Sequence, residues 1–314
     1  MPQNTHLETS LAEEELVQEV TRHAATPQTL TAKATELAKL LVWLPNTASS
    51  TTFSDRAEAT RTSLSSIFEA LPQLIAKAPT SEDLRAVHDN LRVLHLASVG
   101  AVGAAGELSG LPHVRSTKGD ITPRVLALAE GYLDATEYQF SEQGFIIFLN
   151  TFQETTVLKM EELWALVPAL SLILVEQVAL RSQAVMRDPL GPSQNVAACI
   201  RSLQVMNQVT WKELLETLIV FDRILQQDPA DCYAKMDFDS RDVYRSQVAR
   251  ISARSDKDEM GVAKAALALA QQAEQIPDRK ANSERVISLA RQATQTAEDA
   301  RNIAAHDADA TNHK

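Results

Sequence analysis

The sequence predicts an all-α protein, built as a multi-helix bundle or as stacked helical hairpins with a polar C-terminal tail. Alanine and leucine are plentiful, whereas the 314 residues include only 9 glycines, a composition that favours helix. Prolines and short polar stretches divide the chain into segments whose apolar residues recur every three or four positions. No segment shows the sustained apolar–polar alternation that is typical of a strand.

Composition limits both the class of protein and the class of partner. With 314 residues and 45% hydrophobic side chains, the chain can bury a core in one large domain or in two ordinary ones. The net charge of -11 argues against a surface for nucleic acid or anionic membranes, since both require clustered lysine and arginine. The two cysteines, Cys199 and Cys232, are far apart, so we expect no disulfide framework and a reducing, cytoplasmic compartment.

We expect neither a signal peptide nor a membrane span in this chain. The N-terminus lacks a basic stretch followed by an apolar core. The longest apolar run, residues 164–175, is shorter than a bilayer requires and has carboxylates at both ends, Glu162 and Glu176.

The first 78 residues form a predicted N-terminal helical segment. Its predicted helices cover residues 8–22, 28–43 and 54–77. Ser10 and Glu13 have the spacing of a capping box at the start of the first helix, and Pro45 follows the second. Residues 46–52 form a polar linker between the second helix and the third.

Residues 79–276 form a second predicted region, a helical module. Its predicted helices cover residues 80–98, 122–137, 141–153, 160–181, 193–207, 214–225, 240–255 and 258–275. Thr122 followed by Pro123 is a cap with a first-turn proline, and Ser141 caps the next helix. Thr210 and Glu213 form a capping box that opens the helix continuing over residues 214–225.

Three further segments of this sequence carry structural expectations. The helix 160–181 is apolar on nearly all sides, so we expect it to be the buried central helix, kinked at Pro168. Glycines recur from Gly100 to Gly110, where they mark either close helix contact or a weakened helix. Residues 277–314 form a polar, alanine-rich tail with one solvated helix over residues 281–304.

Residues 228–245 hold the densest run of aromatic, acidic and guanidinium side chains in the sequence. Pro229 ends the preceding helix, and either Asp239 or Ser240 is suited to cap the next one. Two guanidinium groups beside a phenol form a candidate edge for binding an anion or a sugar. The six candidate site residues are Tyr233, Asp237, Asp239, Arg241, Tyr244 and Arg245. The alternative is that Arg241 and Arg245 pair with Asp237, Asp239 and Asp242 and fasten the turn.

Three sequence blocks resemble a known family. They are residues 122–133 (TPRVLALAEGYL), 161–170 (EELWALVPAL) and 233–245 (YAKMDFDSRDVYR). In this order and spacing they are similar to the helical region ahead of the catalytic parts of cyclic β-1,2-glucan synthases and related large glycosyltransferase–phosphorylase proteins. Residues 84–92 and 111–115 also look similar, so the resemblance covers residues 80–275.

This chain departs from the family where glycines occupy residues 100–110, where Asp231 precedes Cys232, and where relatives continue into membrane spans and catalytic domains. The resemblance implies a detached helical module that associates with an inner-membrane synthase. It also makes Tyr233 and Tyr244 candidate acceptors of a glucosyl group, since the family builds glucan on the protein itself. Ordinary packing with a satisfied hydroxyl is the alternative for both tyrosines.

Other chemistry is weakly supported by the sequence. Asp237 and Asp239 match the Asp-x-Asp pattern with which nucleotide-sugar transferases hold a divalent ion, but helix capping explains the same spacing. His88 and His95 share one predicted helix without a Glu-x-x-His motif, so we expect no metal site. Solvated faces and caps explain most of the other glutamates, and Glu176, between Val175 and Val178 in the central helix, is the exception that the structure has to check. We expect no catalytic residue and no cofactor.

The first functional hypothesis is a non-catalytic accessory module of a cyclic β-1,2-glucan synthase-like system. Such a module positions β-1,2-glucan or docks on a catalytic glycosyltransferase or phosphorylase partner. The alternative is a stand-alone helical scaffold or regulatory bundle that binds another protein without any sugar. An exposed apolar stripe on the first 78 residues or on residues 258–304 favours that alternative.

Overall fold

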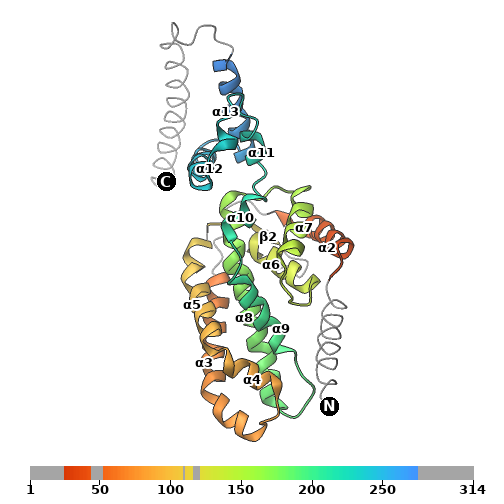
Figure 1. The fold of residues 1–314 in the computed structure, drawn as a ribbon. Coiled ribbons are helices and arrows are strands. Elements are labelled where there is room, and N and C mark those ends of the chain that lie inside the picture. The colour runs from red at the N-terminus through yellow and green to blue at the C-terminus, as the bar shows by residue number, and fades with distance from the viewer. Residues whose placement is uncertain (1–24, 44–51, 109, 116–120, 275–314) are drawn as a thin grey trace, which may run out of the picture. The chain divides into compact units, whose positions relative to one another are not determined.

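The computed structural model describes residues 25–43, 52–108, 110–115 and 121–274, and most of this part of the chain is helical, which confirms the all-α prediction (Figure 1). The elements are α2 (Pro27–Leu40), β1 (Val42–Trp43), α3 (Thr52–Lys77), α4 (Glu82–Asp89), α5 (Leu91–Leu108), β2 (His113–Arg115), β3 (Ile121–Pro123), α6 (Arg124–Ala135), α7 (Glu142–Gln153), α8 (Met160–Arg187), α9 (Val196–Met206), α10 (Trp211–Glu216), α11 (Asp222–Leu225), a 3₁₀ turn (Tyr233–Lys235), α12 (Phe238–Ser252) and α13 (Glu259–Glu274). The predicted helices over residues 8–22 and 281–304 and the polar tail lie outside the described residues.

The chain divides into two compact units. Unit 1 comprises Met1–Val157 and Glu162–Leu214, and unit 2 comprises Leu158–Glu161 and Leu215–Lys314. The expected boundary between residues 78 and 79 falls inside unit 1, because α3 packs against both α4 and α5.

Unit 1 is a bundle of helices around an aliphatic and aromatic core (Figure 1). In it α3 packs on α5, α4 packs on α9, and α2 packs on α6 and α7. Fully buried side chains of this core include Leu64, Ile67, Leu94, Val125, Phe145, Phe148, Leu166 and Val175. The larger members each contribute roughly 1.5–3 kcal/mol through burial, so the bundle depends on their continuous packing.

Helix α8 is the long apolar helix that the sequence predicts, and it extends six residues beyond the expected end, to Arg187. Pro168 lies inside it. Among the described helices, α8 is the one long and apolar enough to cross a membrane by length and composition, but 61% of its most apolar window is buried inside the structure. Such burial is typical of a core helix.

Side-chain caps begin several helices where the sequence places a short polar residue. Ser141 Oγ accepts from the backbone N–H of Gly144 at the start of α7, as expected. The start of α9 is different: it begins at Val196, three residues later than Ser193. There the Asp83 carboxylate accepts from Ser193 Oγ and from the N–H groups of Gln194 and Val196, at 3.1, 2.7 and 2.9 Å. A residue distant in sequence therefore caps α9.

Several sequence-based expectations for unit 1 are wrong in detail. Three short strands form an antiparallel sheet in the order β1-β2-β3, with Val42 opposite Arg115 and Val114 opposite Thr122. Strands of two or three residues are too short to produce an alternating pattern. Thr122 therefore belongs to β3 and does not cap a helix, and α6 begins at Arg124 without a side-chain cap.

The predicted helix over residues 80–98 is two helices, because α4 ends before Asn90. The second of them, α5, continues through Gly100 and Gly103 to Leu108, so these glycines do not end it.

In unit 2, α11 and α12 both pack against α13. The single helix predicted over residues 214–225 is also divided, since α10 ends at Glu216 and α11 begins at Asp222.

Candidate functional site

The stretch after α11 begins with a turn whose backbone is held by the side chain of Asp228. The Asp228 carboxylate accepts from the N–H groups of Ala230, Cys232 and Tyr233 at 3.2, 3.0 and 3.3 Å. Partial burial acts to raise the pKa of Asp228, but these three backbone donors hold it below its ordinary value. Asp231 adopts a positive φ of 51°, a conformation that aspartate tolerates better than most residues.

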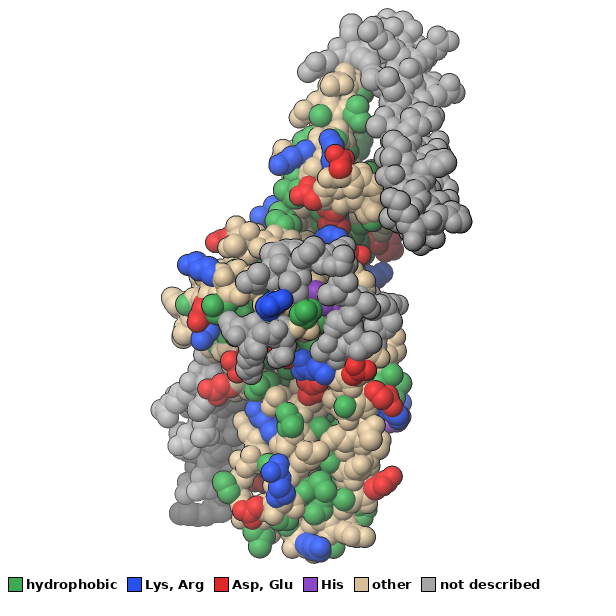
Figure 2. Space-filling view, turned by 180° about the vertical axis from the view of Figure 1, so that it is seen from behind, with side chains coloured by type: hydrophobic (Ala, Val, Ile, Leu, Met, Phe, Trp, Pro, Cys, Tyr) green, Lys and Arg blue, Asp and Glu red, His purple; other side chains and the backbone are tan. Residues whose placement is uncertain are grey.

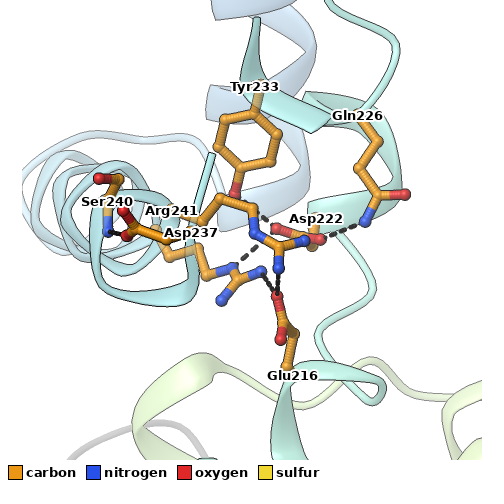
Figure 3. Close-up of polar contacts among 8 residues, drawn as sticks. Glu216, Asp222, Gln226, Tyr233, Asp237, Ser240 and Arg241 are labelled. Atoms are coloured by element: carbon orange, nitrogen blue, oxygen red, sulfur yellow. Dashed lines mark hydrogen bonds and ion pairs between the residues drawn. The ribbon is translucent and has the colours of Figure 1, made fainter. Parts of the chain in front are cut away.

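Asp237 caps α12, the role that the sequence assigned to Asp239 or Ser240. Its Oδ1 accepts from the backbone N–H of Ser240 at 2.7 Å (Figure 3). This capping bond also lowers the pKa of Asp237. Helix capping therefore accounts for the first carboxylate of the Asp-x-Asp pattern. No group of three or more His, Cys, Asp or Glu side chains in the described chain is placed to hold a metal ion.

Arg245 is the centre of a buried ionic network in unit 2 (Figure 3). Its side chain is completely buried, and Nε donates to Asp222 Oδ1 at 2.7 Å while Nη2 donates to Glu216 Oε1 at 2.5 Å. The guanidinium carbon lies 5.5 Å from the centre of the Phe238 ring, within cation–π distance. A fixed fork that bonds two carboxylates at once holds α12 to α11 and α10.

Asp222 accepts hydrogen bonds from three side chains. Besides Arg245, Tyr233 donates its hydroxyl to Oδ1 at 2.5 Å, and Gln226 donates its amide to Oδ2 at 2.6 Å. Burial alone would raise the pKa of Asp222, but the bonds from Arg245 and Tyr233 hold it below its ordinary value. Burial and the bond to a carboxylate both raise the pKa of Tyr233, so this phenol remains protonated at neutral pH.

Arg241 is the peripheral cation of the network. Its Nη2 lies 2.9 Å from Glu216 Oε1, and its side chain keeps 22% exposure whereas Arg245 has none. The two arginines form ion pairs with Glu216 and Asp222, two carboxylates that the local alternative of Asp237, Asp239 and Asp242 does not include. Those two carboxylates precede the predicted site in sequence and come from α10 and α11.

The structure separates the six candidate residues into two sets. Tyr233, Arg241 and Arg245 point into the ionic network, and of these Tyr233 and Arg245 are buried. Asp237, Asp239 and Tyr244 are exposed, with Tyr244 at 51%. The two tyrosine rings meet edge to face, at a centroid distance of 5.9 Å and an interplanar angle of 85°. The buried phenol thus supports the exposed one.

Sequence reasoning missed Glu216 and Asp222, which are the carboxylates that organise this site. One signal was present in the sequence: Asp222 directly follows the apolar run of residues 218–221, where a buried charge needs a partner. Glu216 carries no comparable signal, since a single glutamate next to Leu214 and Leu215 is an ordinary feature of an amphipathic helix.

The other carboxylates and histidines singled out from the sequence have structural partners or solvent around them. Glu176 receives a bidentate contact from Arg56, with Nε and Nη2 donating at 2.9 and 2.5 Å, and Arg56 also reaches Glu130. His88 and His95 are exposed on the surface of unit 1. None of these arrangements has the geometry of a general acid facing a general base.

The hollows of unit 1 also lack a catalytic constellation in the described part of the chain. The larger, with a volume of about 610 Å³, lies between α3 and α8 and is lined by Asp55, Glu58, Ala59, Thr62, Ser63, Ser66, Ile67, Gln183 and Met186. It is open, and Gln183 donates to Ser63 Oγ at 2.8 Å across it. On the face drawn in Figure 2, side chains of both charges are interspersed with single hydrophobic ones. Among the described residues visible on that face, Lys and Arg do not gather into a basic patch of the kind that nucleic acid requires.

The sequence matches no protein-family model and no curated protein.

Proposed function

We propose that this chain is a non-catalytic helical accessory module of a cyclic β-1,2-glucan synthase-like system, and that it contacts glucan along the exposed side of α12. The contact strip consists of Asp237, Ser240 and Tyr244, which are three to four residues apart and so lie on one side of the helix. The proposal is supported by the resemblance of residues 80–275 to that family and by the geometry of this strip.

The single observation that carries the proposal is the half-exposed Tyr244 ring, 51% accessible and in edge-to-face contact with Tyr233. A half-exposed aromatic ring that a neighbouring ring holds in place can stack on a pyranose ring without a large loss of side-chain entropy. Asp237 and Ser240, both exposed, supply oxygen atoms that can accept hydrogen bonds from sugar hydroxyls. An apolar platform beside a few polar atoms is the ordinary composition of a small-ligand site.

The ionic network determines which ligand charge the strip favours. Arg241 and Arg245 are both paired internally with carboxylates, so neither guanidinium faces an incoming ligand alone. The exposed carboxylate of Asp237 gives the strip a negative character. A neutral polyhydroxyl ligand suits this surface better than a phosphate or a nucleotide sugar, which would require exposed cations.

Isothermal titration of the chain with linear β-1,2-glucooligosaccharides tests the proposal. We expect saturable binding by the wild type and about tenfold weaker binding by Tyr244→Ala, because a well-placed aromatic contact contributes about 1.5 kcal/mol. Val243→Ala is the matched control, since Val243 is a neighbouring residue with 59% exposure and no aromatic ring. An absence of saturable binding by the wild type, or equal loss in both variants, contradicts the proposal.

The second candidate is a helical scaffold that binds another protein, and one observation on α13 favours it. The buried residues of α13 are Glu259, Val262 and Ala263, all near its start. The remainder of α13 is mainly alanine and leucine, with Leu269 at 38% exposure, so an apolar surface is available to a partner helix. In this case a defined partner co-purifies from the native source, and Leu269→Asp reduces its recovery whereas Val243→Ala does not.

A further inference from the structure

The outward face of α5 is apolar and glycine-rich, and no described segment of the chain covers it. Leu96 and Val99 are 59% and 46% exposed, respectively. A Cβ atom built on Gly100 or Gly103 would meet nothing within 4 Å. Each glycine weakens a helix by up to ~1 kcal/mol relative to alanine. Gly100 and Gly103 therefore weaken α5 at positions where packing within the described chain does not require a small residue.

The spacing along this face is that of a helix–helix seam. Arg92, Leu96, Val99 and Gly103 follow one another at steps of four, three and four residues, the repeat with which two helices pack along a shared line. Leu96 and Val99 provide projecting side chains, and Gly100 and Gly103 provide surface without side chains. Because both kinds of position occur on one helix, the face is complementary in shape to a second copy of itself.

The charges give this self-complementarity a direction. If two α5 helices lie antiparallel about a twofold axis between residues 99 and 100, Leu96 faces Gly103 of the second copy and Val99 faces Gly100. In the same register the two Arg92 residues lie at opposite ends of the seam, about 20 Å apart along the helix axis. An antiparallel pair thus keeps these like charges apart, whereas a parallel pair would place arginine beside arginine.

The same helix also avoids the repulsion that other surfaces of this protein would generate. The chain carries a net charge of -11, so two copies repel each other through most of their surfaces. Residues 91–106 contain no aspartate or glutamate. Contact along α5 therefore brings two acidic chains together without adding a carboxylate–carboxylate pair to the central part of the interface.

We propose that α5 is the seam of a symmetric homodimer, in which Leu96 of each copy occupies the space over Gly103 of the other. This proposal is independent of glucan binding and concerns a different unit of the chain. A contact of one helix with one helix lies at or below the low end of specific interfaces, about 1,200 Å² of total buried surface. We expect a dimer that forms at micromolar concentration and dissociates on dilution.

Sedimentation velocity of the full chain, from low to high micromolar concentration, tests the proposal. The wild type should shift from monomer to dimer, and Leu96→Glu should remain monomeric over the whole range. Leu180→Glu is the matched control, since Leu180 is equally exposed (56%) on α8 and receives the same substitution. Circular dichroism verifies that both variants keep the helical content of the wild type. A wild type that stays monomeric, or a dimer insensitive to Leu96→Glu, overturns the proposal.

Removal of one charge tests the antiparallel register. Arg92→Ala should leave the dimer unchanged, because the two arginines lie far apart in this register, whereas a parallel pair would gain stability from the loss of two adjacent like charges. A clearly tighter dimer of Arg92→Ala contradicts the antiparallel register.

A disulfide provides a second test of the seam itself. In a Cys232→Ser background, which removes the exposed native thiol, Gly100→Cys places two thiols across the twofold axis. We expect rapid intermolecular oxidation of this variant at concentrations where the dimer forms. Absence of a covalent dimer under those conditions counts against the proposed seam.

Discussion

Replacing Arg245 with methionine should destabilise unit 2 far more than replacing the neighbouring Arg241. Methionine retains most of the aliphatic volume but leaves Asp222, which is 2% exposed, as a buried carboxylate without its cation. Removing one partner of a buried ion pair costs about 3–5 kcal/mol, because the remaining charge is desolvated and unpaired. Arg241→Met removes a single ion pair from a side chain that is 22% exposed, for which we expect about 1 kcal/mol or less.

Two optical probes separate the units in this experiment. All 3 tryptophans, Trp43, Trp164 and Trp211, belong to unit 1, so urea unfolding followed by tryptophan fluorescence reports on that unit. Far-ultraviolet circular dichroism reports on the helices of both units. Arg245→Met should produce an early loss of ellipticity that is absent from the fluorescence transition, and this early phase measures the free energy of unfolding of unit 2.

A double variant tests the cause of the loss. Adding Asp222→Asn to Arg245→Met removes the unpaired negative charge, so it should recover part of the lost stability and give a favourable coupling energy. If Arg245→Met costs no more than Arg241→Met, or if Asp222→Asn adds its own full penalty without recovery, the buried pair does not stabilise unit 2 in the way described.

Three further predictions concern both units. Hydrogen bonds hold the pKa of Asp222 below its ordinary value, so its stabilising contribution is complete above that ordinary pKa and is lost as the pH falls through the lowered pKa. The ellipticity of unit 2 should therefore decrease below about pH 4, and Asp222→Asn should show a weaker acid dependence. Burial raises the pKa of Tyr132 to about 12. Its contribution to the stability of unit 1 is therefore complete below the ordinary tyrosine pKa and is lost between about pH 10 and pH 12. Tyr132→Phe should remove a late step from the absorbance titration at 295 nm. Asp83→Ala leaves the N–H groups of Gln194 and Val196 without their acceptor, and should lower the stability of unit 1 by about 2–4 kcal/mol in the fluorescence transition, whereas Asp89→Ala, at an exposed position, should change it by less than about 0.5 kcal/mol.

The fold class and most helices of the described chain follow from local signals in the sequence. Ser141 caps α7 because its hydroxyl oxygen accepts a hydrogen bond from a free backbone N–H in the first turn of that helix, only three residues away. Two helix breaks, the end of α4 before Asn90 and the division of the helix after Thr210, do not follow from local signals. Apolar periodicity continues through both breaks, and tertiary packing decides where the backbone turns.

The candidate site was only partly predictable, because its decisive interactions are long-range. The stretch 228–245 was identified by composition, and Asp237 and Tyr244 are exposed there. Arg245 had several carboxylates within local reach, yet its partners are Asp222 and Glu216, 23 and 29 residues earlier in the chain. Sequence spacing cannot distinguish these alternatives, since the choice depends on how α10, α11 and α12 pack. The capping of α9 by Asp83 was hidden for the same reason.

Hydrogen exchange with and without β-1,2-glucooligosaccharide measures the glucan contact most directly. At an oligosaccharide concentration near the wild-type dissociation constant, peptides covering Phe238–Ser252 should exchange more slowly in the wild type, while Tyr244→Ala should show little protection and Val243→Ala should behave as the wild type. Unchanged exchange in α12 of the wild type at every concentration of glucan would contradict the assignment of this helix as the contact surface.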